Sequence, residues 1–463
     1  MTHKTLLALL ALALLAAAAC APKTNPHYNY NRPARHLVPP IEKLQSGPMI
    51  GYADMREVLI WVQTKRRASV WVEYSEVGDS SGKKYSTQYV STEPETAYTA
   101  KCIANQVQPG KTYNYRVHID NQPVQLPYPT TFKTQSLWQW RTDPPAFTMV
   151  TGSCNYVNEP EYDRPGKPYG SDHQIFTSIA QQKPDLMLWL GDNTYFREPD
   201  WNTRTGMVHR YTHDRALPEL QPLLASTAHY AIWDDHDFGP NDSDGTWQHK
   251  ETAWEVFRDF WGNPTFGVDG RKGCTTRFQY NDVDFFLLDN RYFRTPNYCR
   301  TCPNRSMLGK EQLEWFLSSL AASQAPFKIV AIGSQVVTDN QLSETHANFF
   351  PAERDTILAR IERERIKGVV FLTGDRHFSE FSSLKNKAGN TVYDLTTSPF
   401  TAGVFSDAGT KVTNSHRVEG TLVVQHNYSL ITVSGPRKAR QMQISMRDMN
   451  GKELWTRTIE EGK

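Results

Sequence analysis

Five short apolar runs in the second part of the chain each end abruptly in a group of polar side chains, and this pattern restricts the possible folds more than any other feature. Their length and composition are typical of buried β-strands. Stretches with helical spacing at 175–182, 308–320 and 352–366 alternate with them. Alternating strands and helices predict an α/β architecture built in layers. The runs are residues 147–150, 186–190, 230–233, 285–288 and 369–372.

The polar groups that follow these runs contain many potential metal ligands. In open α/β sheets, ligands bind beyond the carboxyl ends of the strands, so we expect these groups to share one rim. Carboxylate and amide oxygens suit hard cations such as calcium, whereas thiolate, phenolate and imidazole suit a transition ion such as iron. Carboxylates on one rim repel one another unless cations neutralise them, and ions that share a bridging Asp form a site for phosphoryl chemistry. The side chains are Cys154, Asp192, Tyr195, Asp234, Asp235, His236, Asp237, Asn241, Asp289, Arg291, Asp375 and His377.

Each of these residues, taken alone, has an ordinary structural explanation. Asp192 would cap a turn, His236 would be a hydrogen-bonded structural histidine, and Cys154 would be an inert buried thiol. Tyr195 would be a packing residue with a satisfied hydroxyl. Because unpaired buried charge is costly, several polar strand ends in this order nevertheless favour a functional site.

Residues 46–135 are expected to form an all-β region. Runs at 58–62, 70–74 and 113–119 are rich in β-branched and aromatic residues, and turn-forming stretches separate them. The region resembles a fibronectin-type or immunoglobulin-like sandwich. We therefore divide this part of the chain into an N-terminal β-sandwich domain at 46–137 and a second domain at 146–463.

The first twenty residues have the pattern of an export signal. Lys4 precedes an apolar run from Leu6 to Ala19, which is too short for a spanning helix, since such a helix needs about 20 residues. The sequence Ala17-Ala18-Ala19-Cys20 resembles the lipobox of bacterial lipoproteins, in which the Cys is lipidated. We expect an exported protein of the bacterial periplasm or cell envelope, anchored to the membrane by a lipid on Cys20 and followed by a tether at 21–45. The alternative is an ordinary cleaved signal peptide, with Cys20 incidental.

Charge and cysteine content exclude several other classes of protein. The formal net charge is +2, and no Lys/Arg run is long enough to indicate specific nucleic-acid binding. The sequence indicates no protein partner. The chain has six cysteines, and Cys299 and Cys302 are spaced for a local disulfide in a proline-flanked loop. A zinc site would need a second pair of this kind, which the sequence lacks.

Seven motifs together closely resemble the PhoD-like alkaline phosphatases and phosphodiesterases, which are calcineurin-like metallophosphoesterases. The resemblance covers roughly residues 46–460 and implies a calcineurin-like β-sandwich flanked by helices, with the metallophosphoesterase catalytic domain at 146–463. The motifs are Gly152-Ser-Cys154, Gly191-Asp-x-x-Tyr195, Trp233-Asp-Asp-His-Asp237, Asp289-x-Arg291, Ser306-Met-Leu-Gly309, Gly333-Ser-Gln335 and Gly374-Asp-x-His377.

The resemblance also implies a site with Fe3+ and Ca2+ that hydrolyses phosphate esters. The family's iron ligands fall on Cys154, Asp192, Tyr195, Asp375 and His377. Asp192 would bridge to calcium, with Asn241 and Asp235 as further ligands, and a Tyr195 phenolate on iron would give a purple or reddish colour. Relatives usually carry Glu where this chain has Asp237, and this departure affects the calcium-side loop that contains Asn241.

The mechanism that we expect is in-line attack on phosphorus by a metal-activated hydroxide. His236 would donate a proton to the leaving oxygen or hold an equatorial oxygen, and Arg291, with Arg376 as a second candidate, would clamp the phosphate. The alternative for Arg291 is a salt bridge to Asp289 or another nearby acid. Two other functions remain open: a hydrolase with Cys154 as a thiol nucleophile, and a non-catalytic lipoprotein that binds surface polymers.

The substrate depends on insertion loops at 163–170 and 197–205. Aromatic residues in and beside these loops would stack on a base or a sugar, although the default expectation is that they pack within the loop. They are Tyr162, Tyr169, Phe196 and Trp201. The sequence does not distinguish a diesterase from a monoesterase.

Overall fold

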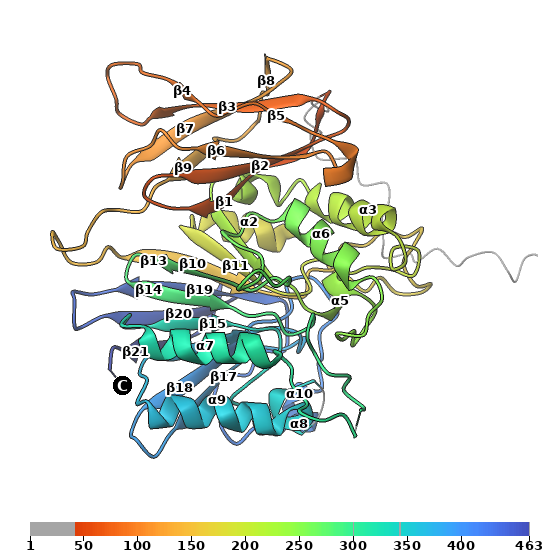
Figure 1. The fold of residues 1–463 in the computed structure, drawn as a ribbon, viewed down its shortest axis with the longest axis vertical. Helices are drawn as coiled ribbons and strands as arrows, with labels where there is room; N and C mark the ends of the chain where they lie inside the picture. Colours follow the sequence, from red (N-terminus) through yellow and green to blue (C-terminus); the bar gives the residue numbers. More distant parts are fainter. Residues whose placement is uncertain (1–41, 300, 342–343, 463) are drawn as a thin grey trace, which may run out of the picture.

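The computed structural model describes residues 42–299, 301–341 and 344–462. Two large β-sheets lie at its centre, helices cover their outer faces, and a third β-sheet lies at the N-terminal end of the molecule (Figure 1). The layered α/β architecture predicted from the sequence is therefore confirmed. The predicted signal and most of the tether fall outside the described residues. None of the described helices has the length and apolar content needed to cross a membrane.

The first sheet has nine strands and combines both ends of the chain. β10, β11 and β12 run parallel and end at the predicted polar clusters, while the C-terminal strands add to one side in antiparallel fashion. In spatial order the strands are β21 (Glu453–Glu460), β20 (Gln441–Asp448), β19 (Asn427–Ser434), β10 (Phe147–Gly152), β11 (Leu186–Leu190), β12 (Ala228–Ile232), β1 (Leu44–Ala53), β2 (Val58–Thr64) and β6 (Thr99–Ala104).

The second sheet has six strands and packs against the first. Phe285, Ile329 and Val370 lie in the same apolar core as residues of the nine-stranded sheet, whereas their neighbours on the strands face the other way, toward helices. This alternation is the pleat of a strand buried on both faces. In spatial order the strands are β13 (Thr276–Tyr280), β14 (Val283–Leu287), β15 (Lys328–Ala331), β16 (Val369–Thr373), β18 (Thr391–Thr396) and β17 (Glu380–Lys385).

The polar strand ends thus come from two facing sheets, and not from one open sheet as predicted. β10, β11 and β12 contribute from one sheet, and β14 and β16 contribute from the other. Both sets of parallel strands end on the same side of the sandwich, so the shared rim that we predicted exists. The packing of the two sheets sets the distance between the strand ends of one sheet and those of the other.

The N-terminal region is all β, as predicted, but one of its sheets continues into the central sheet. β1 pairs in parallel with β12 at Ile50 and Ala228, and β2 and β6 extend the same sheet. The proposed division at 138–145 lies between β9 and β10 and stays a prediction. The third sheet contains β3 (Ser69–Glu76), β4 (Tyr85–Ser86), β5 (Val90–Ser91), β7 (Thr112–Ile119), β8 (Gln122–Pro123) and β9 (Thr131–Lys133).

The three predicted helices are present with small shifts in their ends. They are α2 (Gln174–Gln181), α7 (Lys310–Ala322) and α9 (Pro351–Arg363). α7 begins after Gly309, which has a positive φ of 75°, and α9 begins with a proline, which suits the first turn of a helix. The sequence analysis missed α3 (Arg204–Arg215) and α6 (Lys250–Phe260). The short elements are η1 (Pro94–Thr96), α4 (Gln221–Leu224), α5 (Asp235–Phe238), α8 (His346–Phe349) and α10 (Ala408–Lys411).

The predicted disulfide is also confirmed. Cys299 and Cys302 are bonded in the loop after β14. Among the described residues Cys102, Cys154 and Cys274 are free and buried.

Candidate metal centre

Four predicted ligands gather where β10, β11 and β16 end. The Cys154 sulfur lies 3.7 Å from Asp192 Oδ2, and the Tyr195 hydroxyl donates to the same oxygen at 3.0 Å. The Tyr195 hydroxyl also lies 3.4 Å from His377 Nε2. Donor atoms of Cys154, Asp192 and His377 all fall within 4.8 Å of one another. The segments that carry these residues are far apart in sequence, and the fold brings thiol, carboxylate, phenol and imidazole to one point.

The backbone at this point is held in an unusual conformation. Cys154, Asp192, Asp375 and His377 have φ values of 60°, 50°, 68° and 55°. Residues other than glycine seldom adopt this left-handed region, and such strain concentrates at functional sites. Gly191, just before Asp192, also has a positive φ, and a Cβ there would lie 2.7 Å from Asp234 Cβ. The close approach of Asp234 therefore requires a glycine at position 191, and Asp192 follows it directly.

The tautomer of His377 suits metal binding. Its Nδ1–H donates to the backbone oxygen of Gly403. Since one ring nitrogen is engaged in this way, Nε2 keeps its lone pair and faces the Tyr195 hydroxyl.

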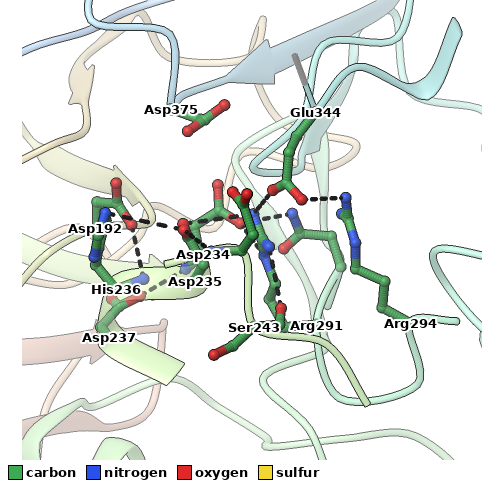
Figure 2. A network of polar contacts seen from close by, with 12 residues as sticks. Asp192, Asp234, Asp235, His236, Asp237, Ser243, Arg291, Arg294, Glu344 and Asp375 are labelled. Carbon is green, nitrogen blue, oxygen red and sulfur yellow. Dashed lines mark hydrogen bonds and ion pairs between the residues drawn. The ribbon is translucent and has the colours of Figure 1, made fainter. Parts of the chain in front are cut away.

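A second group of potential ligands lies beside Asp192 and contains Asp234, Asp235, His236 and Asp375 (Figure 2). Asp192 also belongs to a cluster with Asp235 and His236, and Asp235 belongs to another with Asp234 and Asp375. The backbone N–H of His236 donates to Asp192 Oδ1 at 3.2 Å. The result is a row of overlapping clusters in which single carboxylates are shared, as expected where cations sit side by side.

The short helix α5 positions His236 between these groups. Asp234 and Asp237 form a capping box at its N-terminus, in which the carboxylate of each residue accepts a hydrogen bond from the backbone N–H of the other. The His236 ring stacks on Tyr195 with 4.3 Å between centroids, and its side chain is 23% exposed. Nε2 of His236 lies 3.9 Å from Asp235 Oδ2. His236 therefore stands at the open edge of the cluster, while Asp234 and Asp237 orient its helix.

The pKa values of the acidic side chains in the cluster show that burial and mutual repulsion disfavour their charged forms. Burial raises the pKa of Cys154 to about 12 and that of Asp375 to about 7. Burial, together with the charges of Asp235 and Cys154, raises the pKa of Asp192 well above its usual value. Burial also raises the pKa of Tyr195 well above its ordinary value. These groups are all of the kinds that cations hold in their deprotonated forms.

The donor set therefore fits the metals that the sequence analysis inferred. One end offers sulfur, phenolate, imidazole and carboxylate, which suit iron, and the other offers only carboxylates next to a histidine, which suit a harder cation. Asp234 Oδ2 is fully buried and has no hydrogen-bond partner among the described residues. A cation beside it would satisfy this orphan oxygen.

Arg291 does not occupy the position expected of a phosphate clamp. Its side chain is completely buried and pairs with Asp234 at 2.5 Å, Glu344 at 2.6 Å and Asp235 at 3.5 Å. A group that grips substrate needs free donors facing the opening, so we withdraw the clamp assignment. The alternative from the sequence, a salt bridge to a nearby acid, is the observed state, although the partners are not Asp289. Arg291 acts as a built-in cation of the site.

This internal cation controls the charge on Asp235. Burial by itself would raise the pKa of Asp235, but Arg291 and His236 outweigh it, so the pKa lies below its usual range. In the same way, Arg291 and Arg294 outweigh burial at Glu344 and lower its pKa. Both carboxylates are therefore ionised at neutral pH and able to bind a cation.

The calcium-side loop contributes a residue that was not predicted. Asn241 and Asp242 are both exposed, and ligand oxygens of Asp235, Asp242 and Glu344 lie within 4.8 Å of one another, whereas Asn241 stays a predicted ligand. The backbone N–H of Asp242 donates to Asp235 Oδ2 at 2.7 Å. The sequence signal for Asp242 was its place beside Asn241. Glu344 follows no strand, so no local pattern indicated it.

A two-sheet α/β sandwich with a shared-carboxylate cluster at its strand ends is the architecture of the calcineurin-like metallophosphatases. The model of the PhoD-like phosphatase family matches residues 150–438, and the chain belongs to that family. A domain of unknown function, DUF7800, matches residues 41–137. The resemblance stated from the sequence motifs is thus confirmed.

Individual relatives agree with this assignment. Alkaline phosphatase D of Bacillus subtilis (strain 168) is 23% identical over 342 residues, which cover 63% of this chain and 55% of the relative. A structure described as PhoD superposes with a TM-score of 0.72 at 18% identity, over 91% of this chain and 93% of that one. Purple acid phosphatase PPD1 from yellow lupin (Lupinus luteus) seeds gives a TM-score of 0.64 at 12% identity, over 91% and 75%. These structures share the fold, including the calcineurin-like sandwich.

Proposed function

We propose that this protein is a metal-dependent phosphoric ester hydrolase, active as an alkaline phosphatase or phosphodiesterase. The observation that carries the proposal is the continuous row of donors from Cys154 through Asp192 to Asp235 and His236. Family membership and the name of the B. subtilis relative support the same activity.

Iron and calcium are the proposed metals. Cys154, Asp192, Tyr195 and His377 would hold Fe3+, with Asp375 at its edge, and Asp192, Asp235, Asp242 and Glu344 would hold Ca2+. When bound, the cations would lower the pKa of a coordinated water and neutralise the charge of the phosphate. Asp242 joins this proposal because its carboxylate belongs to that cluster, and the neighbouring Asn241 stays a proposed calcium ligand.

His236 is the proposed proton donor to the leaving oxygen. Its ring is fixed on Tyr195 yet partly exposed, and Asp235 lies on its Nε2 side. Burial lowers its pKa, and Asp235 opposes that shift. Asp235 would therefore help the ring to carry a proton when substrate is bound.

Arg376 is the proposed contact to phosphate oxygens now that Arg291 is assigned to the interior. Arg376 directly follows the predicted ligand Asp375 in sequence, and its Nη1 lies 3.7 Å from Asp375 Oδ2. A guanidinium so placed can reach an anion beside the metal ligands.

A thiol mechanism at Cys154 is disfavoured by the geometry. The sulfur is completely buried, its pKa is raised to about 12, and the Ser398 hydroxyl donates to it at 3.1 Å. A nucleophilic cysteine needs exposure and a lowered pKa. A non-catalytic lipoprotein that binds surface polymers would not account for the strained backbone at the four ligand positions.

Export and lipid anchoring at Cys20 complete the proposal. They rest on the signal-like sequence of residues 1–20, and the membrane is the one partner that we infer besides substrate. Radiolabelled palmitate incorporated into the wild-type protein and absent from Cys20→Ala would support the anchor.

One experiment tests the catalytic proposal directly. Purified protein is analysed for metals, and its hydrolysis of bis-p-nitrophenyl phosphate and p-nitrophenyl phosphate is measured before and after chelation. We expect iron and calcium, loss of activity with EDTA and recovery with calcium. Activity that resists chelators but is abolished by iodoacetamide would replace this proposal with the thiol mechanism.

A further inference from the structure

One aromatic side chain stands at the open edge of the metal-ligand cluster. It is Tyr169, in the long loop between β10 and α2, and its residue is 47% exposed. Of the four loop aromatics that the sequence suggested for substrate contact, Phe196 is buried and the other two, Tyr162 and Trp201, are partly buried. Tyr169 is therefore the one with a large free surface.

The position of the Tyr169 ring is fixed by the residues of the site. Its centroid lies 4.9 Å from that of Tyr156, 6.3 Å from Tyr195 and 6.0 Å from His377. Its hydroxyl lies 3.3 Å from His377 Nδ1. A Cβ at Gly403 would lie 2.7 Å from Tyr169 Cε2, so only a glycine there lets the ring settle against the backbone.

The exposed Tyr169 and the exposed edge of the cluster share Tyr195 as a neighbour. Tyr195 packs against both Tyr169 and His236, and the His236 and Asp375 side chains are 23% and 21% exposed. A phosphate held by the cluster would place its organic group near this edge. Because its neighbours fix the ring before substrate arrives, little conformational entropy is lost when another ring stacks on it.

We propose that Tyr169 is a stacking surface for the alcohol part of the substrate, and that the site prefers phosphate esters carrying a flat aromatic ring, such as a nucleoside. This inference rests on the proposed phosphoesterase function and adds a substrate class to it. Stacking of a base on an aromatic side chain needs its ring and not its hydroxyl. Tyr169 is thus a specificity-determining residue.

The test compares two esters that differ only in their organic group. Adenosine 5′-phosphate and glycerol 3-phosphate are both monoesters of primary alcohols, and their methyl diesters serve if the enzyme is a diesterase. The ratio of kcat/KM for the adenosine ester to that for the glycerol ester is measured in wild type, Tyr169→Phe and Tyr169→Ala. Tyr162→Ala is the matched control, since its ring lies 5.7 Å from that of His209 on α3.

We expect wild type and Tyr169→Phe to share the preference for the adenosine ester. In Tyr169→Ala the ratio of kcat/KM values should fall about 10-fold, mainly because KM for the adenosine ester rises. Tyr162→Ala should keep the wild-type ratio. A ratio that is unchanged in Tyr169→Ala, or a wild type without preference for adenosine, would overturn the inference while leaving hydrolysis intact. Failure of the metal-loaded wild type to hydrolyse either pair or the aryl phosphates would instead remove the proposed function, and this inference with it.

Discussion

The Tyr195 hydroxyl lies 3.4 Å from Nε2 of His377, although 182 residues separate the two in sequence. The lone pair of the imidazole and the oxygen of the phenol meet at the point that the Cys154 sulfur and an Asp192 oxygen also face. No pair of these residues belongs to one local motif except Asp192 and Tyr195. The left-handed backbone at Cys154, Asp192 and His377 therefore occurs at the residues whose donor atoms meet here, which is where such strain concentrates in functional sites.

Replacing Tyr195 by Phe should remove the phenolate from the proposed iron site. We expect loss of a purple or reddish absorption band and about a 100-fold drop in activity or iron affinity, since each ligand contributes strongly to a metal site. Visible spectroscopy and metal analysis check this. Tyr162→Phe should leave both unchanged, and a Tyr195→Phe protein that kept the full band would show that the colour has another source.

Replacing His236 by Asn should slow the cleavage of esters with poor leaving groups. Loss of a proton donor reduces such rates by about 100-fold or more, whereas p-nitrophenolate leaves without a proton. Steady-state rates on an alkyl and a p-nitrophenyl ester measure the contrast. His209→Asn alters a histidine whose side chain is 45% exposed, on α3, and should have no such effect. Equal losses on both esters would rule out general acid catalysis.

Replacing Arg291 by Met should destabilise the whole domain. Asp234 would keep a buried charge without its close ion-pair partner and Glu344 would keep only Arg294, which together cost about 3–5 kcal/mol of unfolding free energy. Urea unfolding measures the change, with Arg164→Ala as the control because that side chain is 85% exposed. Adding Glu344→Gln should restore part of the loss. An Arg291→Met protein of wild-type stability would contradict the role as an internal cation.

Calcium should stabilise the protein more at high pH than at low pH. Burial raises the pKa of Asp375 to about 7 and that of Asp242 to about 6, so these carboxyls hold protons below those values when no cation is bound. Above them, charge repulsion destabilises the metal-free fold, and a cation relieves it. The gain in Tm from calcium, measured by calorimetry, should therefore grow between about pH 6 and pH 8. A constant gain would count against Asp242 as a calcium ligand and against a calcium ion close to Asp375.

Acid should weaken the fold through His229. It accepts from Trp189 Nε1 at 3.0 Å, and burial lowers its pKa to about 3. Because the unfolded chain binds the proton more readily, this part of the stability is complete above about pH 6.5 and falls as pH drops toward 3, by about 2 kcal/mol at pH 5. His229→Gln keeps a donor and an acceptor but does not titrate, so it should flatten the slope of unfolding free energy against pH. An unchanged slope would exclude His229 as the cause.

Much of the fold could be predicted because its signals are local. The apolar runs that became β10, β11, β12, β14 and β16, and the spacing that became α7 and α9, depend only on near neighbours in sequence. α3 was missed because it is strongly polar on most of its surface, and its buried charges, such as Arg210, are paired by tertiary contacts. The pairing of β1 with β12 was not predicted because it depends on contacts between residues that are far apart in sequence.

In the site, too, local features could be predicted from the sequence and long-range contacts could not. The amino-acid sequence alone determined which residues stand at the strand ends, and so the chemistry of Cys154, Asp192, His236 and His377, because strand length and polarity are local properties. Only the tertiary structure decided that Arg291 is an internal cation, that Asp242 and Glu344 lie beside Asp235, and that Tyr169 is exposed. The reason is physical: electrostatic pairing and exposure depend on distances across two packed sheets, and these distances exist only once the sandwich has formed.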